Sequence, residues 1–206
     1  MTQYAFYFDG TRCTGCKTCV FACKDKNNCD LGISYRKVYE ITYGETNRDE
    51  NNCFTTTCVS YPLSMSCNHC SNPACVKACP TGAMHKDSDT GLVSVDETRC
   101  IGCGYCHMAC PYNAPKVDSN KGVSAKCNGC ADKVAAGEKP SCVMSCPARA
   151  LDFGTVEEMS KKGTQAAIAP LPEPSYTNPN LYINPSRDAL PVGNMSGKIV
   201  NPLEVQ

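Results

Sequence analysis

Cysteine recurs along this chain in four runs of four. In each run the third and fourth cysteines are four residues apart. The pattern C-x2-C-x2-C-x3-C-P is typical of bacterial ferredoxins, whose thiolates bind 4Fe–4S clusters. The runs are Cys13, Cys16, Cys19 and Cys23; Cys67, Cys70, Cys75 and Cys79; Cys100, Cys103, Cys106 and Cys110; and Cys127, Cys130, Cys142 and Cys146. Four intact runs predict four 4Fe–4S clusters.

The runs differ in their details. The last three end in cysteine followed by proline, whereas Lys24 follows the first run. The longer gap between Cys130 and Cys142 predicts a loop between two ligands. Glycines lie between ligands in three runs, where we expect them to permit backbone angles that bring the chain close to a cluster. These glycines are Gly15, Gly102, Gly104 and Gly129.

Two other uses of many cysteines compete with iron–sulfur binding. A secreted disulfide framework suits an even number of cysteines, but the chain has 19 and its runs are too tight for pairing within a run. A zinc site needs four ligands from two C-x2-C pairs, so the third cysteine of each run would be surplus. Both alternatives fit the spacing poorly.

The spacing within a run also indicates which cysteines share a cluster. Cysteines four residues apart lie on one face of a helical turn, so they can bind two neighbouring clusters. The segments Ala83–Lys86 and Leu92–Asp96 read as a hairpin that links the second and third runs, as in a two-cluster ferredoxin. We therefore expect runs two and three to exchange their fourth cysteines, and runs one and four to do the same.

This reasoning predicts four ligand sets, which we call quartets. Quartet one is Cys13, Cys16, Cys19 and Cys146; quartet two is Cys67, Cys70, Cys75 and Cys110; quartet three is Cys100, Cys103, Cys106 and Cys79; quartet four is Cys127, Cys130, Cys142 and Cys23.

The rest of the sequence must position these ligands. We predict an α+β fold of two bacterial-ferredoxin-like modules with short helices and β-hairpins. Residues 1–62 and 119–169 form the first module, with an insertion at about 30–62, and residues 63–118 form the second. Residues 170–206 contain seven of the 14 prolines and predict an extended tail that contacts a partner through apolar anchors. The anchors are Leu171, Tyr176, Leu181, Tyr182 and Ile183.

Smaller elements follow from local patterns. Strands are expected at Tyr4–Phe8 and within Ile33–Tyr43, and a polar surface loop at Gly44–Asn52. Lys116–Asp118 and Val123–Lys126 predict a second hairpin. Thr155 and Glu158 form a capping box that should start a short helix running to about Lys162.

Composition excludes several functions. The 206 residues have a formal net charge of zero, which argues against a nucleic-acid-binding surface. No apolar stretch is long enough to span a membrane, and no signal peptide is evident. We find no arrangement for nucleophilic or acid–base catalysis, and no histidine pair for a Rieske centre. Cys29, Cys53 and Cys58 lie outside the runs and are expected to be free or buried thiols, with a Cys53–Cys58 disulfide as the alternative in an oxidising compartment.

The runs together resemble a known family. The stretches RCTGCKTCVFACKD, SCNHCSNPACVKACPTGAMHK, RCIGCGYCHMACPYNAP and KCNGCADKVAAGEKPSCVMSCPARALDFG, with the tail from APLP through TNPN, resemble the iron–sulfur (B) subunits of anaerobic dimethyl sulfoxide reductases. These belong to the molybdopterin oxidoreductase complexes. The resemblance covers nearly the whole sequence.

The resemblance implies partners that the residues alone do not. It implies a large catalytic subunit that holds bis-molybdopterin guanine dinucleotide, and a membrane subunit that oxidises quinol. It also implies co-export with a partner that carries a twin-arginine signal, giving a membrane-associated complex on the extracytoplasmic face, with the cytoplasm as the alternative. The protein itself would relay electrons. Alternatives are a free-standing polyferredoxin, or the same role for another molybdenum enzyme such as an aromatic dehydroxylase.

Overall fold

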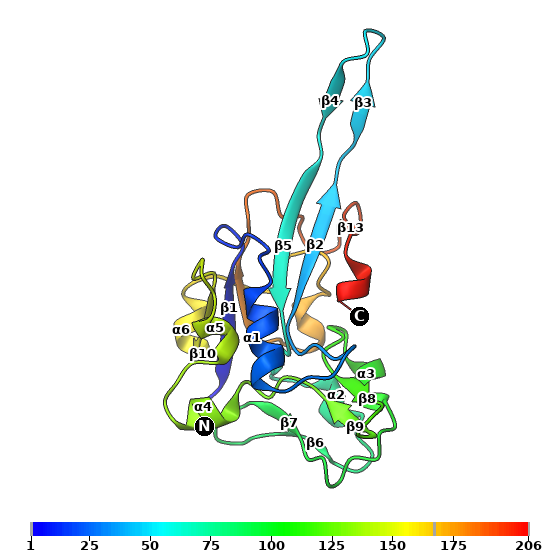
Figure 1. Ribbon diagram of the computed structural model, residues 1–206. Helices are drawn as coiled ribbons and strands as arrows, with labels where there is room; N and C mark the ends of the chain where they lie inside the picture. Colours follow the sequence, from blue (N-terminus) through cyan, green and yellow to red (C-terminus); the bar gives the residue numbers. More distant parts are fainter. Residues whose placement is uncertain (1, 167, 206) are drawn as a thin grey trace.

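The computed structural model describes residues 2–166 and 168–205. Met1 and Ala167 of the predicted first module, and Gln206 of the predicted tail, lie outside the described residues. The fold combines short helices with small β-sheets, as Figure 1 shows, and this confirms the predicted α+β class.

The helices are short, and four of them carry the second half of a cysteine run. In α1 the third and fourth cysteines, Cys19 and Cys23, both lie within the helix. In α2, α3 and α5 the third cysteine is helical and the fourth follows the last helical residue by one or two positions, as predicted. The helices are α1 (Thr18–Lys26), α2 (Ala74–Lys77), α3 (Tyr105–Ala109), α4 (Ala131–Ala135), α5 (Ser141–Met144) and α6 (Val156–Ser160), with 3₁₀ turns η1 (Pro174–Tyr176) and η2 (Pro202–Glu204).

The predicted capping box begins α6. The Thr155 side chain accepts a hydrogen bond from the Glu158 N–H, and the Glu158 carboxylate accepts one from the Thr155 N–H. The helix ends at Ser160, two residues earlier than expected, because the chain turns at Lys161 to enter the next strand.

The largest sheet joins both ends of the chain. It runs in the order β10–β1–β12–β11, with β1 antiparallel to β10 and parallel to β12. The predicted strand β1 buries Ala5, Phe6 and Phe8, and the Phe6 ring packs edge-on against Phe153 with centroids 4.9 Å apart. The strands are β1 (Tyr4–Asp9), β10 (Leu151–Thr155), β11 (Thr164–Gln165) and β12 (Leu181–Asn184).

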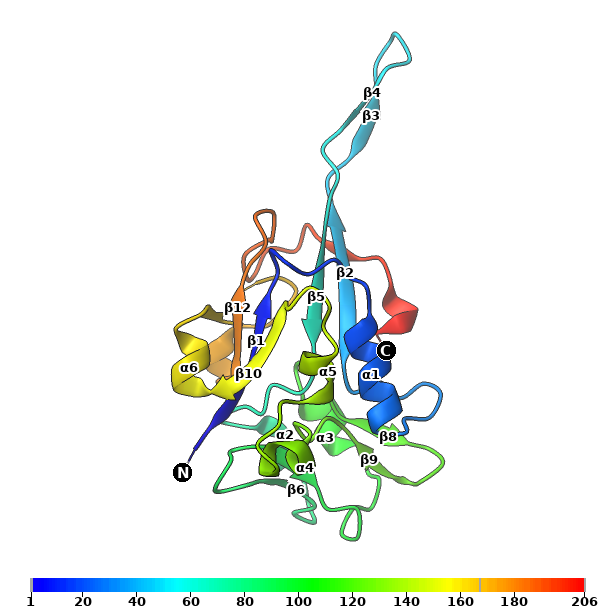
Figure 2. The same cartoon turned by 60° about the vertical axis from the view of Figure 1, so that its left-hand side comes forward.

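A second sheet has the order β13–β2–β5 and extends into a long arm. β2 (Lys37–Tyr43) and β5 (Val59–Met65) pair antiparallel along their full length, and β13 (Lys198–Ile199) adds to β2. Residues of this sheet and of the β1 sheet share one apolar core. Beyond them β3 (Thr46–Arg48) and β4 (Phe54–Thr56) continue as a hairpin that projects from the body (Figures 1 and 2).

This hairpin corrects the expectation of a loop at Gly44–Asn52. Thr46 pairs with Thr56 and Arg48 with Phe54, so β-branched and aromatic residues form a ladder although every residue of both strands is exposed. The turn includes Asn52 at φ 64°, a left-handed conformation that Asn tolerates.

Two small hairpins confirm the sequence prediction. β6 (Met84–Lys86) pairs with β7 (Val93–Val95), and β8 (Lys116–Asp118) pairs with β9 (Val123–Ala125). They lie with α2 and α3 at the end of the molecule opposite the projecting arm (Figure 1).

Part of the proline-rich tail packs against the protein itself. Its strand β12 is part of the central sheet, and Leu171, Leu181 and Ile183 are buried in the core of the protein itself. Of the other expected anchors, Tyr176 is exposed and Tyr182 is partly buried. The buried apolar residues therefore stabilise the protein's own fold and do not serve only as contacts for a partner. The strand β12 forms because one edge of β1 is free to pair with a parallel strand.

Candidate metal centres

Two of the predicted quartets each line a cavity. Cys13, Cys16, Cys19 and Cys146 surround one space together with Gly15, Ser64 and Pro147. Cys79, Cys100, Cys103 and Cys106 surround a second space with Gly102, Gly104 and Ser124. Each cavity thus combines three cysteines of one run with the fourth cysteine of another.

The other two quartets are more deeply buried. Burial raises the pKa of Cys70 and of Cys75 to about 12, and the neighbouring Cys67 and Cys110 act in the same direction. These four residues form quartet two, and their mutual influence shows that they lie together.

Quartet four is gathered around the end of α1. Burial raises the pKa of Cys23, and Cys127, Cys142 and Cys130 beside it act in the same direction. Cys23 comes from the first run, so the helix α1 carries cysteines of two different quartets on one face. α1 packs against α5, which does the same with Cys142 and the following Cys146.

Backbone amides point at the sulfur atoms. The N–H groups of Met84, Ser124, Gly129 and Ala150 each donate to a cysteine Sγ at 3.3 Å, and the acceptors are Cys79, Cys100, Cys127 and Cys146 in that order. Such bonds stabilise thiolate charge and raise the potential of a cluster that the thiolates bind.

Glycines allow the close approach of the chain to these cavities, as expected. Gly102 has φ 66°, and a Cβ placed on it would lie 2.4 Å from the Gly122 carbonyl oxygen. Gly129 has φ 75°, and its Cβ would lie 2.9 Å from Leu92. Any side chain at either position would therefore strain the loop between two cysteines.

The residues present fit iron–sulfur clusters. The donor set is all sulfur, which is the ligand that such clusters require. Across residues 2–166 and 168–205, no three His, Cys, Asp or Glu side chains come close enough to bind a single metal ion. Buried cations lie beside the sulfur atoms, and the Nε of Arg36 is buried without a hydrogen-bond acceptor among the described protein atoms.

Comparison with known proteins gives the same indication. A family model described as a 4Fe–4S dicluster domain matches residues 58–156. The sequence is 52% identical over 206 residues to the B subunit of anaerobic dimethyl sulfoxide reductase from Haemophilus influenzae, and the match covers 100% of both proteins. The B subunit of the same name from Escherichia coli K12 is 53% identical over 205 residues, or 99% of each protein. This protein belongs to the family of anaerobic dimethyl sulfoxide reductase B subunits.

The family membership confirms the resemblance seen in the cysteine runs. A more distant relative, the thiosulfate reductase electron transfer subunit of Salmonella typhi, is 41% identical over 157 residues, covering 76% of this protein and 78% of that one. As a member of the B-subunit family, the protein is a 4Fe–4S electron-transfer subunit of a reductase complex and has no catalytic site of its own.

Sequence reasoning missed three buried polar residues at the sulfur sites of this B subunit. His69 is fully buried, its Nδ1 accepts from the Val93 N–H at 2.9 Å, and its Nε2 lies 3.8 Å from Cys127 Sγ. Burial holds the pKa of His69 well below its usual value, with Lys126 beside it acting in the same direction, so the ring is neutral and Nε2 carries the proton toward sulfur. Arg36 and Lys126 are the other two. Their only signal in the sequence is a charged residue within or next to an apolar stretch.

His107 follows Cys106 in α3. Its Nδ1 lies 2.8 Å from the Pro115 carbonyl oxygen, so in the structure the ring contacts the backbone.

The cysteines outside the runs are free thiols. Cys29 is half-buried, whereas Cys53 and Cys58 are exposed at the tip and base of the β3–β4 hairpin. Cys58 Sγ lies 3.5 Å from the Thr46 hydroxyl, and Cys53 Sγ lies 4.0 Å from the Asn51 carbonyl oxygen.

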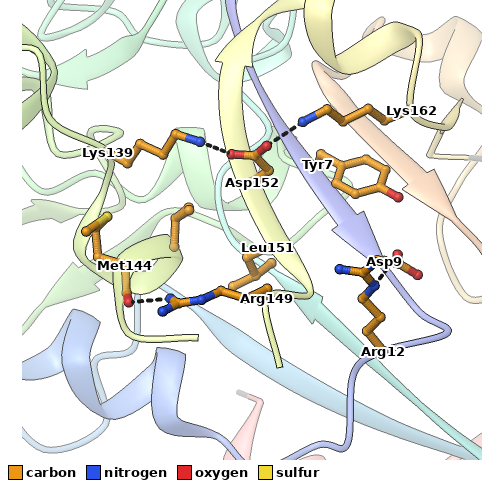
Figure 3. A pocket seen from close by; sticks show the side chains of 10 residues that line it. Tyr7, Asp9, Arg12, Lys139, Met144, Arg149, Leu151, Asp152 and Lys162 are labelled. Carbon is orange, nitrogen blue, oxygen red and sulfur yellow. Dashed lines mark hydrogen bonds and ion pairs between the residues drawn. The ribbon is translucent and has the colours of Figure 1, made fainter. Parts of the chain in front are cut away.

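A larger pocket opens beside quartet one and is lined by charged residues (Figure 3). Asp152 lies between Lys139 at 2.6 Å and Lys162 at 2.5 Å, and Arg12 pairs with Asp9 at 3.5 Å. Arg149 donates to the Met144 carbonyl at 3.1 Å. The pocket therefore has four cations and two carboxylates around its wall, and an excess of positive charge.

No helix within the described part of the protein is both long and apolar enough to cross a membrane.

Proposed function

We propose that this protein binds four 4Fe–4S clusters, one on each quartet. The observation that supports this proposal is the grouping of sixteen cysteines from four runs into four sets, with the fourth cysteine of each run contributed to another set. An iron–sulfur cluster supplies reversible one-electron redox chemistry when bound. The protein contributes thiolates at each position, backbone N–H donors to sulfur in quartets one, three and four, and buried cations beside quartets one, two and four.

The quartets follow one another in the order one, four, two, three. Cys19 of quartet one influences the pKa of Cys142 in quartet four, and Cys67 of quartet two influences that of Cys127 in quartet four. α2 packs against α3, and these helices carry cysteines of quartets two and three. We therefore propose one row of four cluster positions along the molecule.

The same contacts support the proposed division into modules. Runs one and four, in residues 1–62 and 119–169, meet through α1 and α5. Runs two and three, in residues 63–118, meet through α2 and α3, with the β6–β7 hairpin between them.

The two ends of the row are exposed to solvent in different ways. Quartet one lies beside the basic pocket described above and exposes Cys16. Quartet three exposes Cys103 among Ile101, Tyr105 and Met108, which are large apolar residues more than half exposed. We propose that these two faces contact different partners. The charged face meets a large molybdopterin catalytic subunit, and the apolar face meets a membrane subunit that oxidises quinol.

The protein then relays electrons from that membrane subunit, or another donor, to a catalytic subunit that reduces a small acceptor such as dimethyl sulfoxide. Only the catalytic subunit holds bis-molybdopterin guanine dinucleotide. A relative named for thiosulfate reductase is the same type of subunit, so the acceptor is a property of the partner. We place the complex at the extracytoplasmic face of the membrane, where export would depend on a partner's twin-arginine signal.

The test is metal analysis of the tagged protein purified without oxygen from its own host. We expect about 16 iron atoms on this subunit in addition to those of its partner, and about one molybdenum per copy. About 16 iron atoms with no molybdenum and no large co-purifying subunit would instead identify a free-standing polyferredoxin. Zinc in place of iron would refute the cluster assignment. Cell fractionation would show on which face of the membrane the complex lies.

A further inference from the structure

Arg36 is a fully buried cation without a carboxylate partner among the residues that the structure describes. It is 2% exposed, and none of the ion pairs within the described residues includes it. An isolated buried charge is strongly unfavourable, so a buried guanidinium requires an anion nearby. The position of that anion follows from the surroundings of Arg36.

The groups that face the guanidinium are cysteines of two quartets. Burial by itself would lower the pKa of Arg36, but the nearby Cys142, Cys19, Cys127 and Cys23 outweigh burial and raise it. Cys19 belongs to quartet one, and the other three belong to quartet four. Arg36 therefore lies at the junction of two proposed cluster positions, where these cysteines are the source of negative charge.

The guanidinium is held in place by neutral groups. Nη1 donates to the Ser64 hydroxyl at 3.1 Å and Nη2 donates to the Ser66 hydroxyl at 2.9 Å. The Phe6 ring lies 5.0 Å from the guanidinium carbon, a distance typical of a cation–π contact. The Ser64 hydroxyl also lies 3.4 Å from Cys19 Sγ, so the same hydroxyl connects Arg36 with quartet one.

One donor of Arg36 is unused. Nε is buried and has no acceptor at hydrogen-bonding geometry among the described protein atoms, although the guanidinium lies close enough to Cys142 to oppose the effect of burial, which raises the pKa of that thiol. A sulfur-rich anion bound at either quartet supplies both the missing acceptor and the missing charge.

We propose that Arg36 is a positioning residue that holds a permanent positive charge between quartets one and four and raises the reduction potentials of the clusters bound there. The inference rests on the proposed cluster binding. One-electron reduction adds one negative charge to a cluster and its thiolates, and the donor of the complex supplies that electron. A fixed cation in a water-poor interior stabilises the reduced form more than the oxidised form. No proton is transferred, because Arg remains charged throughout.

The test compares Arg36→Met and Arg36→Lys with the unmodified complex, purified without oxygen, by redox titration with electron paramagnetic resonance. Ligand variants Cys16→Ser, Cys130→Ser and Cys103→Ser assign the signals of quartets one, four and three. For Arg36→Met we expect the two clusters beside Arg36 to become roughly tenfold harder to reduce, which is about 59 mV for a one-electron couple. Quartet three is the internal control and should not change. Arg36→Lys keeps the positive charge, so the reduction potentials of the two clusters should return most of the way to those of the unmodified complex.

If Arg36→Met does not retain all of its iron, the quartets from which iron is lost still test the proposed role of Arg36. Selective loss at quartets one and four that Arg36→Lys repairs supports the proposal. Unchanged potentials, an equal shift at all four clusters, or loss of all iron without rescue by lysine would overturn it. Absence of clusters from the unmodified complex refutes the proposed function instead, so the two failures are distinguishable.

Discussion

Lys126 Nζ lies 3.6 Å from the Sγ of Cys67, although 59 residues separate the two in the sequence. The ammonium group also donates to the carbonyl oxygens of Val93 and, at 2.6 Å, of Cys127. It therefore joins quartet two to quartet four. Buried cations therefore lie at two successive junctions between quartets: Arg36 between quartets one and four, and Lys126 between quartets four and two.

Replacing Lys126 by methionine should destabilise the protein. The change leaves two buried carbonyl groups without their charged donor, which costs roughly 2 kcal/mol. We expect a lower denaturant midpoint for cluster loss, followed by visible absorbance under anaerobic conditions. Lys121→Met is the matched control, because Lys121 is exposed on the β8–β9 turn. Equal midpoints for the two variants would show that the buried ammonium contributes nothing.

Cys142 and Cys146 are only four residues apart in the sequence but belong to different quartets. We therefore expect Cys146→Ser to change the same cluster signal as Cys16→Ser, because Cys16 and Cys146 line one cavity. Cys142→Ser should instead change the same signal as Cys130→Ser. Electron paramagnetic resonance and iron analysis of the four variants provide the test. If Cys142→Ser and Cys146→Ser affect one common signal, the exchange of fourth cysteines between runs is wrong.

Iron retention should weaken as the pH falls. Burial raises the pKa of Cys70, Cys75 and Cys127 to about 12, so these thiols are neutral at pH 7 when no metal is bound. Iron must displace their protons, and protons compete better at lower pH. The rate of iron transfer to a chelator should therefore rise steadily from pH 8 to pH 6. A rate that does not depend on pH would contradict the assignment of these thiols as ligands.

Removing the β3–β4 hairpin should leave the clusters intact. Thr46–Arg48 and Phe54–Thr56 are exposed and contain none of the quartet cysteines. We expect a variant whose residues 46–56 are replaced by a short Asn-Gly turn to keep about 16 iron atoms and its potentials. Cys67→Ser, which removes a proposed ligand from the body of the fold, is the comparison and should lower the iron content. Loss of iron from the shortened variant would contradict this expectation and would show that the hairpin stabilises the cysteine quartets.

Local patterns predicted much of this fold. The strand at Tyr4–Phe8, the hairpin between Met84 and Val95, and the capping box at Thr155 each depend on about a dozen residues or fewer, and each forms as expected. The proximity of the cysteines in each quartet also followed from spacing and the β6–β7 hairpin. Their assignment as cluster ligands stays a prediction.

The features that were missed depend on contacts between distant residues. Leu181–Asn184 is too short to indicate a strand by its pattern, and it becomes one because the edge of β1 is free. Arg36 is buried only because Ser64, Ser66 and Phe6 surround it in the folded protein. No local rule connects an arginine to hydroxyl groups about thirty residues away, so these buried cations required the structure.

The pairing of β1 with β12 and the distribution of the quartets bear on the order in which the protein matures. The cysteines of quartets two and three lie between residues 67 and 110, whereas quartets one and four need Cys142 and Cys146 as well. Synthesis proceeds from the N-terminus, so all cysteines of quartets two and three are present on the ribosome before quartets one and four are complete. The opening strand Tyr4–Asp9 then waits for Leu181–Asn184 before its sheet can close. The quartet that contains Cys13, Cys16 and Cys19 therefore cannot be complete until Cys146, and with it most of the protein, has been made.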